Sequence, residues 1–373
     1  MMKPIFDVGL DTRMFRHTGI GTYIRNVLAA FKEDRVFDRL RFGLFGTETT
    51  RELYGDVPVR EFLPKIYSVS EQLVYPKLLS DCRLWHAPHY NIPLMRGKTR
   101  LIVTIHDLIH WIFRKQFFAP HQNIYSAVML RAAVSMPDHI IAVSEHTKSD
   151  LVKHFNADPE KVSVIYEAAD LKFNAFRDES AISEVKKKYS ITRPYFLFVG
   201  SLKPHKNVHR LIRLFRQLHK EAHTEAVLVL AGRKDKYYPS GYEELSALQS
   251  GQGILHLEGV QDSELKHLYQ GALALIHPSL YEGFGLTLLE AMGSGTPVIA
   301  SQSASIPEVT GDAACLVDSC QDPAMMQAIR RMETDPVYRF GLRERGLRRA
   351  SQFSWRETAS KTLALYEKVL SER

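Results

Sequence analysis

The sequence predicts an α/β protein built from two parallel β-sheets. Short apolar runs alternate with longer amphipathic stretches along most of the chain, and this alternation is typical of parallel sheets covered by helices on both faces. The chain has 373 residues, which at roughly 100–200 residues per domain indicates two or three domains. The pattern gives about ten strands, more than the usual four to six of one sheet, so two sheets are expected.

The apolar runs predict the strands in order. A first strand is expected within residues 1–10, where Asp7 argues against a secretory signal. Further strands are predicted at 42–45, 101–105, 140–144, 162–166, 195–199, 226–231, 254–257, 272–277, 297–300 and 314–317. Apolar residues at helical spacing predict helices at 23–31, 122–133, 146–155, 209–219, 263–269, 286–292 and 355–370.

A charge-rich segment separates the two expected domains. Asp178, Glu179 and Glu184 precede three consecutive lysines at 186–188, and a new strand begins after Arg193 and Pro194. We therefore expect an N-terminal domain at 1–170, a linker at 171–193 and a C-terminal domain at 194–354, followed by a last helix at about 355–373.

The composition excludes several classes of protein. Forty-nine basic residues against 42 acidic ones give a net charge of +7, which suits a phosphorylated substrate or an anionic membrane face but does not indicate nucleic-acid binding. Three scattered cysteines, Cys82, Cys315 and Cys320, indicate a reducing compartment with neither a disulfide framework nor a cysteine metal site. No segment has 18 uninterrupted apolar residues, so no membrane span is expected.

The segment from His277 to Ala300 carries the most chemistry. A strand ends near His277, and Gly283 and Gly285 flank a turn that opens the helix predicted at 286–292. A glycine-containing turn at a helix N-terminus presents free N–H groups to an anion. Glu282 and Glu290 bracket this turn at a separation of about 12 Å if helical, so they can hold two ends of one ligand with a charged middle, such as a nucleotide sugar. On spacing alone, ordinary surface roles for both glutamates stay open.

Two further loops follow predicted strands. Lys203, His205 and Lys206 follow the strand at 195–199, and His106 and Asp107 follow the strand at 101–105. Ligands bind at the carboxyl ends of strands in open α/β sheets, where lysine can neutralise a diphosphate and histidine can donate to oxygen. An exposed basic loop and a core histidine are the simpler alternatives.

The loop after the first strand carries a glycine pair. Gly19 and Gly21 form a GxG sequence without the third glycine of the dinucleotide fingerprint. No acidic residue closes a following strand in the manner of an NAD ribose contact, so an NAD-dependent oxidoreductase is disfavoured.

Together these segments resemble a retaining glycosyltransferase of the GT-B fold, family GT4, with bacterial mannosyltransferases of O-antigen and exopolysaccharide assembly among the similar proteins. The resemblance covers nearly the whole chain, and its most specific element is Glu282…Glu290 within EGFGLTLLEAMGSGTPVIAS. Its other segments are 143–151, 164–170, 198–207, 257–260, 305–309 and 353–355. The resemblance implies two Rossmann-like domains facing across a cleft, an N-terminal acceptor-binding domain with the last helix packed back on it, and a C-terminal nucleotide-sugar-binding domain.

The resemblance also implies residue roles. His106 and Glu282 match the catalytic pair beside the transferred sugar, and Glu290 matches the ribose-binding glutamate. The remaining matches are donor-binding residues: Gly19, Gly21, Ser201, Lys203, Lys206, Val260, Gly283, Phe284, Gly285 and Leu286. No cofactor and no metal are expected, because basic side chains and helix dipoles replace a metal at the diphosphate and the chain has no suitably placed DxD motif.

The sequence departs from the family pattern at two places. Ser201 and His205 stand where relatives often carry arginine, so one positive charge is missing unless Lys203, Arg13 or Arg16 supplies it. Ala304 and Ser305 stand where relatives often carry glycine, which predicts a stiffer loop at 301–308.

The expected reaction is hexose transfer from a nucleotide sugar, with GDP-mannose as first choice, to a hydroxyl of a lipid-linked glycan by a cytoplasmic enzyme that contacts the inner face of the membrane. An isomerase resembling sugar-nucleotide 2-epimerases and a non-catalytic glycan-assembly subunit are the alternatives. The N-terminal half supplies candidate acceptor contacts: Tyr67, Tyr75, Trp85, His86, His89, Tyr90, Asn91, Trp111, Phe113, Arg114, Lys115, Phe117, Phe118 and His121.

Overall fold

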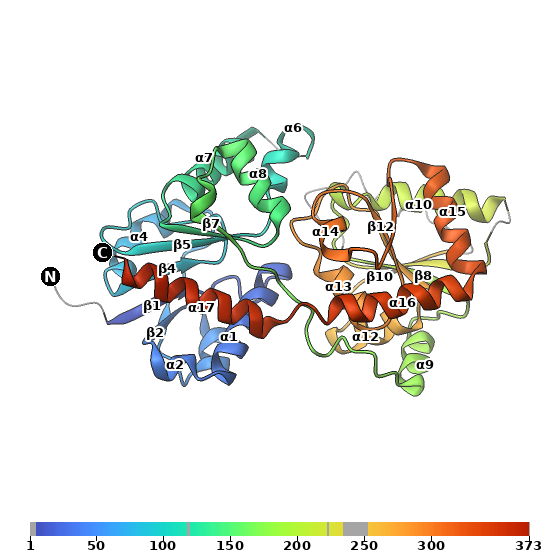
Figure 1. Ribbon diagram of the computed structural model, residues 1–373, viewed down its shortest axis with the longest axis horizontal. Coiled ribbons are helices and arrows are strands. Elements are labelled where there is room, and N and C mark those ends of the chain that lie inside the picture. The colour runs from blue at the N-terminus through green and yellow to red at the C-terminus, as the bar shows by residue number, and fades with distance from the viewer. Residues whose placement is uncertain (1–4, 118–119, 222–223, 234–252, 373) are drawn as a thin grey trace. The chain divides into compact units, whose positions relative to one another are not determined.

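The computed structural model describes residues 5–117, 120–221, 224–233 and 253–372. The chain divides into two compact units (Figure 1). The first unit contains residues 1–167 and 354–373, and the second contains residues 168–353. Each unit carries its own parallel sheet.

The first unit has a seven-stranded sheet in the order β3-β2-β1-β4-β5-β6-β7. Every strand pair is parallel. Its strands are β1 (Phe6–Asp11), β2 (Phe42–Gly46), β3 (Val59–Glu61), β4 (Cys82–Ala87), β5 (Arg100–Ile105), β6 (His139–Ala142) and β7 (Val162–Val164). Its helices are α1 (Gly19–Glu33), α2 (Val36–Arg39), α3 (Glu48–Tyr54), α4 (Val69–Leu79), α5 (Ile109–Ile112), α6 (Arg114–Phe117), α7 (Pro120–Ser135), α8 (Glu145–Phe155), the 3₁₀ turn η1 (Pro159–Lys161) and α17 (Trp355–Ser371).

The second unit has a six-stranded parallel sheet in the order β10-β9-β8-β11-β12-β13. Its strands are β8 (Tyr195–Val199), β9 (Val227–Ala231), β10 (Ile254–Leu257), β11 (Ala274–His277), β12 (Val298–Ser301) and β13 (Cys315–Val317). Its helices are α9 (Glu179–Lys188), the 3₁₀ turn η2 (Pro204–Lys206), α10 (Val208–Lys220), α12 (Asp262–Gly271), α13 (Leu286–Gly293), α14 (Ile306–Thr310), α15 (Asp322–Thr334) and α16 (Pro336–Ala350).

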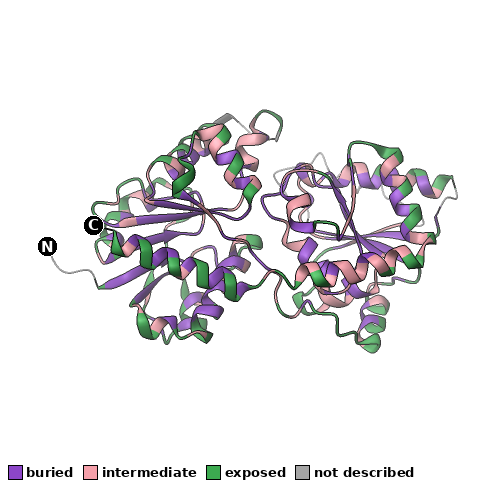
Figure 2. Cartoon of the chain, viewed as in Figure 1, coloured by how far each residue is buried: buried purple, intermediate pink, exposed green. Residues whose placement is uncertain are grey.

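Burial explains why these segments form layered sheets. Strands β1, β2, β8 and β9 are buried at every position, whereas the helices bury one face and expose the other (Figure 2). Helix α10 is typical, because its apolar residues recur at helical spacing and pack on the sheet through Leu211, Ile212 and Phe215. The predicted α/β class with two parallel sheets is confirmed.

The last helix belongs to the first unit. The Tyr366 ring on α17 contacts the rings of Phe31 and Phe42, and its hydroxyl lies 2.6 Å from Nδ1 of His86. Thr358 Oγ1 donates a hydrogen bond to the carbonyl oxygen of Tyr166. These contacts join the end of the chain to the first sheet.

Two strands and one linker differ from the sequence-based expectation. Strands β3 and β4 were not predicted, since β4 includes the exposed Arg83 and the polar His86. His86 is fully buried because its ring nitrogens have partners in Tyr366 and Thr104. The stretch expected as a linker, residues 171–193, lies within the second unit and contains α9.

The strand order places a switch point in each sheet. In the second sheet the strand order reverses between β8 and β11: β9 and β10 lie beyond β8, and β12 and β13 lie beyond β11. In the first sheet the order reverses between β1 and β4 in the same way. Ligands of open α/β sheets bind at the carboxyl ends of the strands beside such a switch point. The loops after β8 and β11, and those after β1 and β4, are therefore the places to look for a site.

Candidate active site

Glu282 forms the centre of the polar cluster in the second unit. It follows β11, and Lys206 closes the turn η2 after β8. Lys206 Nζ lies 2.6 Å from Oε1 and 2.9 Å from Oε2 of Glu282, and His277 Nε2 lies 2.9 Å from Oε1. The side chains are only 17% and 10% exposed for Lys206 and Glu282. The switch point of this sheet thus holds a largely buried charge pair.

The charge state of Glu282 follows from these partners. Burial alone would raise the pKa of its carboxyl group. The charge of Lys206 and the hydrogen bond from His277 outweigh burial and hold the pKa of Glu282 well below its usual value. Glu282 is therefore an anion at neutral pH and can accept hydrogen bonds.

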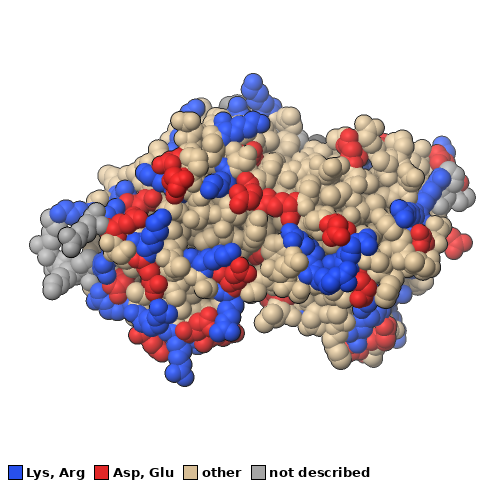
Figure 3. Space-filling view, in the orientation of Figure 1, with Lys and Arg blue, Asp and Glu red and all other residues tan. Residues whose placement is uncertain are grey.

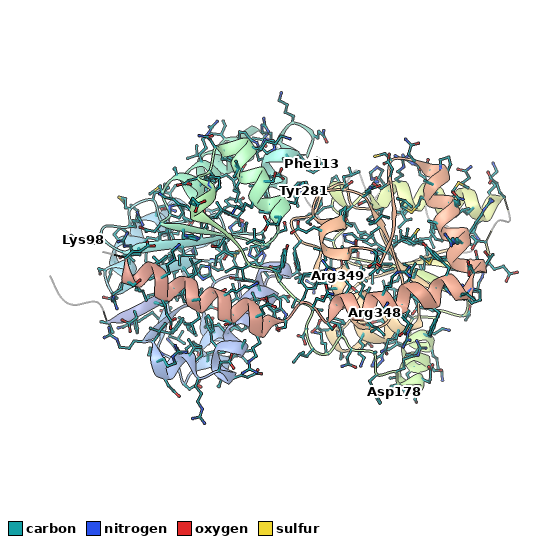
Figure 4. The ribbon with its side chains drawn as sticks, viewed as in Figure 1. Lys98, Phe113, Asp178, Tyr281, Arg348 and Arg349 are labelled. Atoms are coloured by element: carbon teal, nitrogen blue, oxygen red, sulfur yellow. The ribbon has the colours of Figure 1, made fainter. Side chains whose placement is uncertain are left out.

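The turn after Glu282 is fixed by its neighbours. Gly285 has φ 106°, a left-handed conformation that favours glycine, and it caps the N-terminus of α13. The buried Ser305 hydroxyl lies 2.9 Å from the carbonyl oxygen of Glu282 and 3.0 Å from that of Phe284. Phe284 is buried and packs edge-on against Phe353. Gly283 through Leu286 thus form a rigid entry to α13, with Tyr281 just before it (Figure 4).

Basic residues of α16 hold the neighbouring helix. Arg349 donates hydrogen bonds to the carbonyl oxygens of Glu308 and Val309, in and near the last turn of α14, and stacks over Phe353. Figure 3 shows basic side chains gathered over the part of α16 where Figure 4 labels Arg348 and Arg349. Arg349 therefore fixes α14, whose N-cap Ser305 is bonded to the turn before α13.

Glu290 occupies a different electrostatic environment. Its Oε2 accepts a hydrogen bond of 2.9 Å from the hydroxyl of the buried Tyr269. Burial of the carboxyl group raises the pKa of Glu290 to about 7, and Tyr269 and Lys172 offset only part of this effect. Glu282 and Glu290 therefore differ in charge behaviour at neutral pH.

The remaining residues predicted to bind a donor follow the strands of the same sheet. Ser201 lies just beyond β8, Lys203 caps η2, and Val260 follows Gly259 beyond β10. His205 is buried, and its carbonyl oxygen accepts a hydrogen bond from the N–H of Leu280 in the loop after β11. His205 thus joins the two loops beside the switch point.

In the first unit, His106 follows β5 and has partners at both ring nitrogens. Nδ1 lies 3.0 Å from Oε1 of Glu167, and Nε2 lies 3.0 Å from the carbonyl oxygen of Pro88. Glu167 is 4% exposed. Both ring nitrogens of His106 are therefore bonded within the ligand-free chain. To contact a ligand, His106 must exchange one of these two partners.

Arg13 is not available as the missing phosphate-binding cation. Its guanidinium contacts Asp11, Glu71 and Tyr75, and lies 3.7 Å from the centre of the Phe62 ring. The side chain is 4% exposed. Arg13 instead links the end of β1 to α4, whereas Arg16 is exposed.

The two N-terminal glycines lie in a helix rather than in the expected loop. Helix α1 begins at Gly19, so Gly19 and Gly21 occupy its first turn. A Cβ on Gly21 would lie 2.5 Å from the carbonyl oxygen of Phe15, whereas one on Gly19 would meet nothing within 4 Å. Close packing against the backbone therefore requires glycine at position 21, whereas a side chain at position 19 would have space.

Several candidate acceptor contacts are core residues. Tyr75, Trp85 and His86 are fully buried in the first unit, so they cannot stack on a sugar in this state. Tyr67 is exposed and approaches the rings of His89 and Tyr125. The side chains of Phe117, Phe118 and His121 lie outside the described residues.

Four contacts around the predicted residues do not follow from the sequence pattern. His277, at the end of β11, contacts Glu282, and the hydroxyl of Tyr269 on α12 donates a hydrogen bond to Glu290. Glu167 pairs with His106, and Ser305 fastens the turn. The available signals were a histidine that ends the buried strand β11 and a glutamate that closely follows β7. Among the described residues, no group of three His, Cys, Asp or Glu side chains could hold a metal ion.

Solved structures identify the fold. Sucrose-phosphate synthase from Thermosynechococcus elongatus superposes with a TM-score of 0.78 at 19% identity, covering 98% of this chain and 99% of that one. HepE from Anabaena, in complex with UDP-glucose, superposes with a TM-score of 0.76 at 18% identity, covering 96% and 100%. The protein thus has the GT-B fold of two Rossmann-like domains.

Sequence comparisons identify the family. The profile "Glycosyltransferase Family 4" matches residues 19–173, and "Glycosyl transferases group 1" matches residues 181–350. O-antigen chain mannosyltransferase B from Escherichia coli is 29% identical over 76% of this chain and 74% of its own length. O-antigen chain mannosyltransferase RfbU from Salmonella typhimurium is 32% identical over 68% and 66%. The chain belongs to the GT4 family of GT-B glycosyltransferases, and the predicted family is confirmed.

Proposed function

We propose that the protein transfers mannose from GDP-mannose to a hydroxyl of a growing, lipid-linked glycan with retention at the anomeric carbon. The observation that carries the donor side is the pair of glutamates on either side of the α13 entry, one ion-paired and one with a raised pKa. The mannose assignment is supported by the relatives, which are named as O-antigen mannosyltransferases.

In the proposed complex, the second unit holds the donor. Backbone N–H groups of the turn from Gly283 to Leu286 and the Lys206 ammonium would contact the diphosphate. Glu290 would accept hydrogen bonds from the ribose hydroxyls, and Glu282 from the sugar hydroxyls. Ser201, Lys203 and Val260 would line the phosphate and base ends. The arrangement stabilises the charge that develops on the leaving diphosphate.

In the proposed reaction, the acceptor oxygen attacks the anomeric carbon from the face that the diphosphate leaves. The carbon–oxygen bond to the phosphate breaks, the bond to the acceptor forms, and the acceptor proton passes to the released phosphate oxygen. Glu282 is assigned as a sugar-holding anion and not as a nucleophile, because Lys206 and His277 already stabilise its charge. The first unit supplies His106 and the acceptor-binding surface.

A transfer assay tests the activity. The protein is incubated with radiolabelled GDP-mannose, UDP-glucose or TDP-glucose and a membrane lipid extract as acceptor source, with and without EDTA. Label should move from GDP-mannose into a glycan-containing lipid, and the chelator should not change the rate. Transfer from UDP-glucose alone would contradict the mannose assignment, and release of free sugar without transfer would contradict the acceptor assignment.

The surface of the first unit supports the proposed lipid-linked acceptor. Asn91 joins α4 to α7, since it bonds Glu71 and Tyr125, and Leu94 is bonded to Gln72 of α4. Exposed apolar side chains lie on these three segments: Val69, Leu73, Leu94, Met95, Ile124 and Val128. Exposed basic residues occur on and near them: Lys65, Lys77, Lys98 and Arg131. Apolar and basic side chains together suit an anionic lipid surface.

Vesicle flotation tests this contact. No described helix is long and apolar enough to cross a membrane, so binding should be peripheral and should weaken with salt. The double substitution Val69→Ser with Leu73→Ser should reduce flotation with anionic vesicles, while Leu53→Ser, an exposed leucine on α3, serves as the matched control. No binding of the unaltered protein at low salt would contradict the membrane contact.

A further inference from the structure

His106 lies between two groups that both accept hydrogen bonds. The carbonyl oxygen of Pro88, 3.0 Å from Nε2, can only accept, so Nε2 must carry a hydrogen. A neutral imidazole has a single N–H, which would leave the lone pair of Nδ1 facing Glu167 Oε1 at 3.0 Å. A neutral ring would need a protonated Glu167 to donate to Nδ1, whereas an imidazolium satisfies both contacts with Glu167 as a carboxylate.

Other groups around the ring do not remove this charge. Asp107 is adjacent and favours the charged form of His106. The Tyr23 ring packs edge-on at 5.2 Å. Burial lowers the pKa of His86 to about 3 and that of His89 well below its usual value, so neither neighbouring imidazole is charged near neutral pH. His106 contacts the carboxylate of Glu167, whereas the ring nitrogens of His86 contact the hydroxyls of Tyr366 and Thr104.

The balance of effects on His106 agrees with the geometry. Burial alone would lower the pKa of its ring, but the hydrogen bond and charge of Glu167, with the Pro88 carbonyl, raise it above the usual value. Glu167 is itself buried at 4% exposure, and a buried carboxylate is stable only when it is paired. Each group thus supports the charge of the other.

We propose that Glu167 is a positioning residue that keeps both ring nitrogens of His106 protonated, so that His106 acts as a cation and hydrogen-bond donor and not as a base. This inference rests on the proposed function, in which His106 lies beside the transferred sugar. A doubly protonated ring has no lone pair to take the acceptor's proton, and that proton therefore goes to the leaving phosphate oxygen. The Nε2–H can exchange the Pro88 carbonyl for an oxygen of the substrate without losing Glu167.

The test compares Glu167→Gln with the unaltered protein by two readouts. NMR titration follows the His106 ring, whose resonance is identified by its loss in His106→Gln. The variant should titrate at lower pH, because the amide has no charge to offset burial. In the transfer assay, the high-pH limb should move to lower pH, with a loss of about tenfold at pH 8 and less than about threefold at pH 6.

A control and a second variant keep the result interpretable. Asp150→Asn removes the carboxylate beside His146 on α8 and should leave both readouts unchanged. If Glu167→Gln does not fold, Glu167→Asp, which retracts the carboxylate by one methylene, should lower the His106 titration by a smaller amount. An unmoved His106 titration, or an equal loss of transfer at all pH values, would overturn the proposal. The NMR readout decides it even if no sugar is transferred, which separates its failure from that of the proposed function.

Discussion

Lys206 Nζ lies within 2.9 Å of both carboxylate oxygens of Glu282. This bidentate contact joins the loop after β8 to the loop after β11, at the switch point of the second sheet. In the ligand-free chain the cation assigned to the diphosphate is therefore already neutralised by the anion assigned to the sugar. Donor binding must redistribute these contacts, which makes the pair a test of both assignments.

Replacing only one member of the Lys206–Glu282 pair should lower the free energy of unfolding. Replacing both members should recover most of that loss. Lys206→Met leaves the nearly buried Glu282 without its cation, and we expect a loss of about 3 kcal/mol in the free energy of unfolding. The double variant Lys206→Met with Glu282→Gln should recover most of this loss but remain inactive. Urea unfolding of the unaltered protein, Lys206→Met, Glu282→Gln and the double variant measures the coupling, and additive losses would contradict a direct charge pair.

Substitutions at Glu282 and Glu290 should affect different steps: transfer for Glu282 and nucleotide binding for Glu290. Glu282→Gln frees Lys206 for phosphate, so the affinity for GDP should be unchanged or higher while transfer falls at least about a hundredfold. Glu290→Gln should weaken GDP itself by about tenfold or more, because the ribose loses its carboxylate acceptor. Calorimetric titration with GDP and the transfer assay separate the two effects, and the reverse pattern would overturn the assignments.

The raised pKa of Glu290 predicts a pH-dependent nucleotide affinity. Since the pKa is about 7 in the empty protein, the carboxylate that accepts the ribose hydroxyls becomes scarce below neutrality. The affinity for GDP should fall about tenfold between pH 8 and pH 6. Glu290→Gln should bind GDP more weakly with little pH dependence, and an equally steep dependence in that variant would contradict the assignment.

The same group should affect the stability of the empty protein in the opposite sense. The folded pKa of Glu290 lies above the usual value of 4.5, so the folded chain binds more protons than the unfolded chain between pH 4.5 and about 7. The contribution of Glu290 is therefore favourable at low pH and is lost as pH rises through this window. Thermal unfolding of the unaltered protein and of Glu290→Gln at several pH values should reveal this difference.

The substitution Ala304→Gly should make the protein more stable. Its φ is 53°, a conformation that costs non-glycine residues about 1–2 kcal/mol. We expect Ala304→Gly to raise the free energy of unfolding by about 0.5 kcal/mol after the greater freedom of glycine in the unfolded chain is subtracted. Ala181→Gly in α9 is the control and should lower it by a similar amount. A loss in both variants would show that Ala304 is not strained.

The sequence predicts the sheets because parallel strands are continuous apolar runs. It also points to Glu282 and Lys206, because each follows a strand of the same sheet, and the family resemblance adds Glu290 within α13 as part of one donor site. Nothing in the spacing shows that Lys206 and Glu282 form an ion pair. Strand β4 escaped prediction because Arg83 and His86 interrupt its apolar pattern.

The remaining differences arise from contacts between distant segments. Because Arg13 lies in the loop after the first strand, the sequence suggests a cation that is available to a ligand. In the structure, Arg13 is instead ion-paired with Asp11 and Glu71 inside the first unit. Glu167 pairs with a histidine 61 positions earlier in the chain. Such partners depend on which strands are neighbours, and local residue patterns do not contain that information.

The most direct test of the proposed donor site is a thermal-shift panel with GDP, UDP, TDP, ADP and NAD, run on the unaltered protein and on Glu290→Gln. A ligand at 100 times its dissociation constant stabilises the folded state by about 2.7 kcal/mol, which is readily seen. A donor site for GDP-mannose predicts a clear shift with GDP, none with NAD, and a much smaller GDP shift in the variant. No shift with any nucleoside diphosphate, or an equal shift in Glu290→Gln, would contradict a donor site built on Glu282, Lys206 and Glu290.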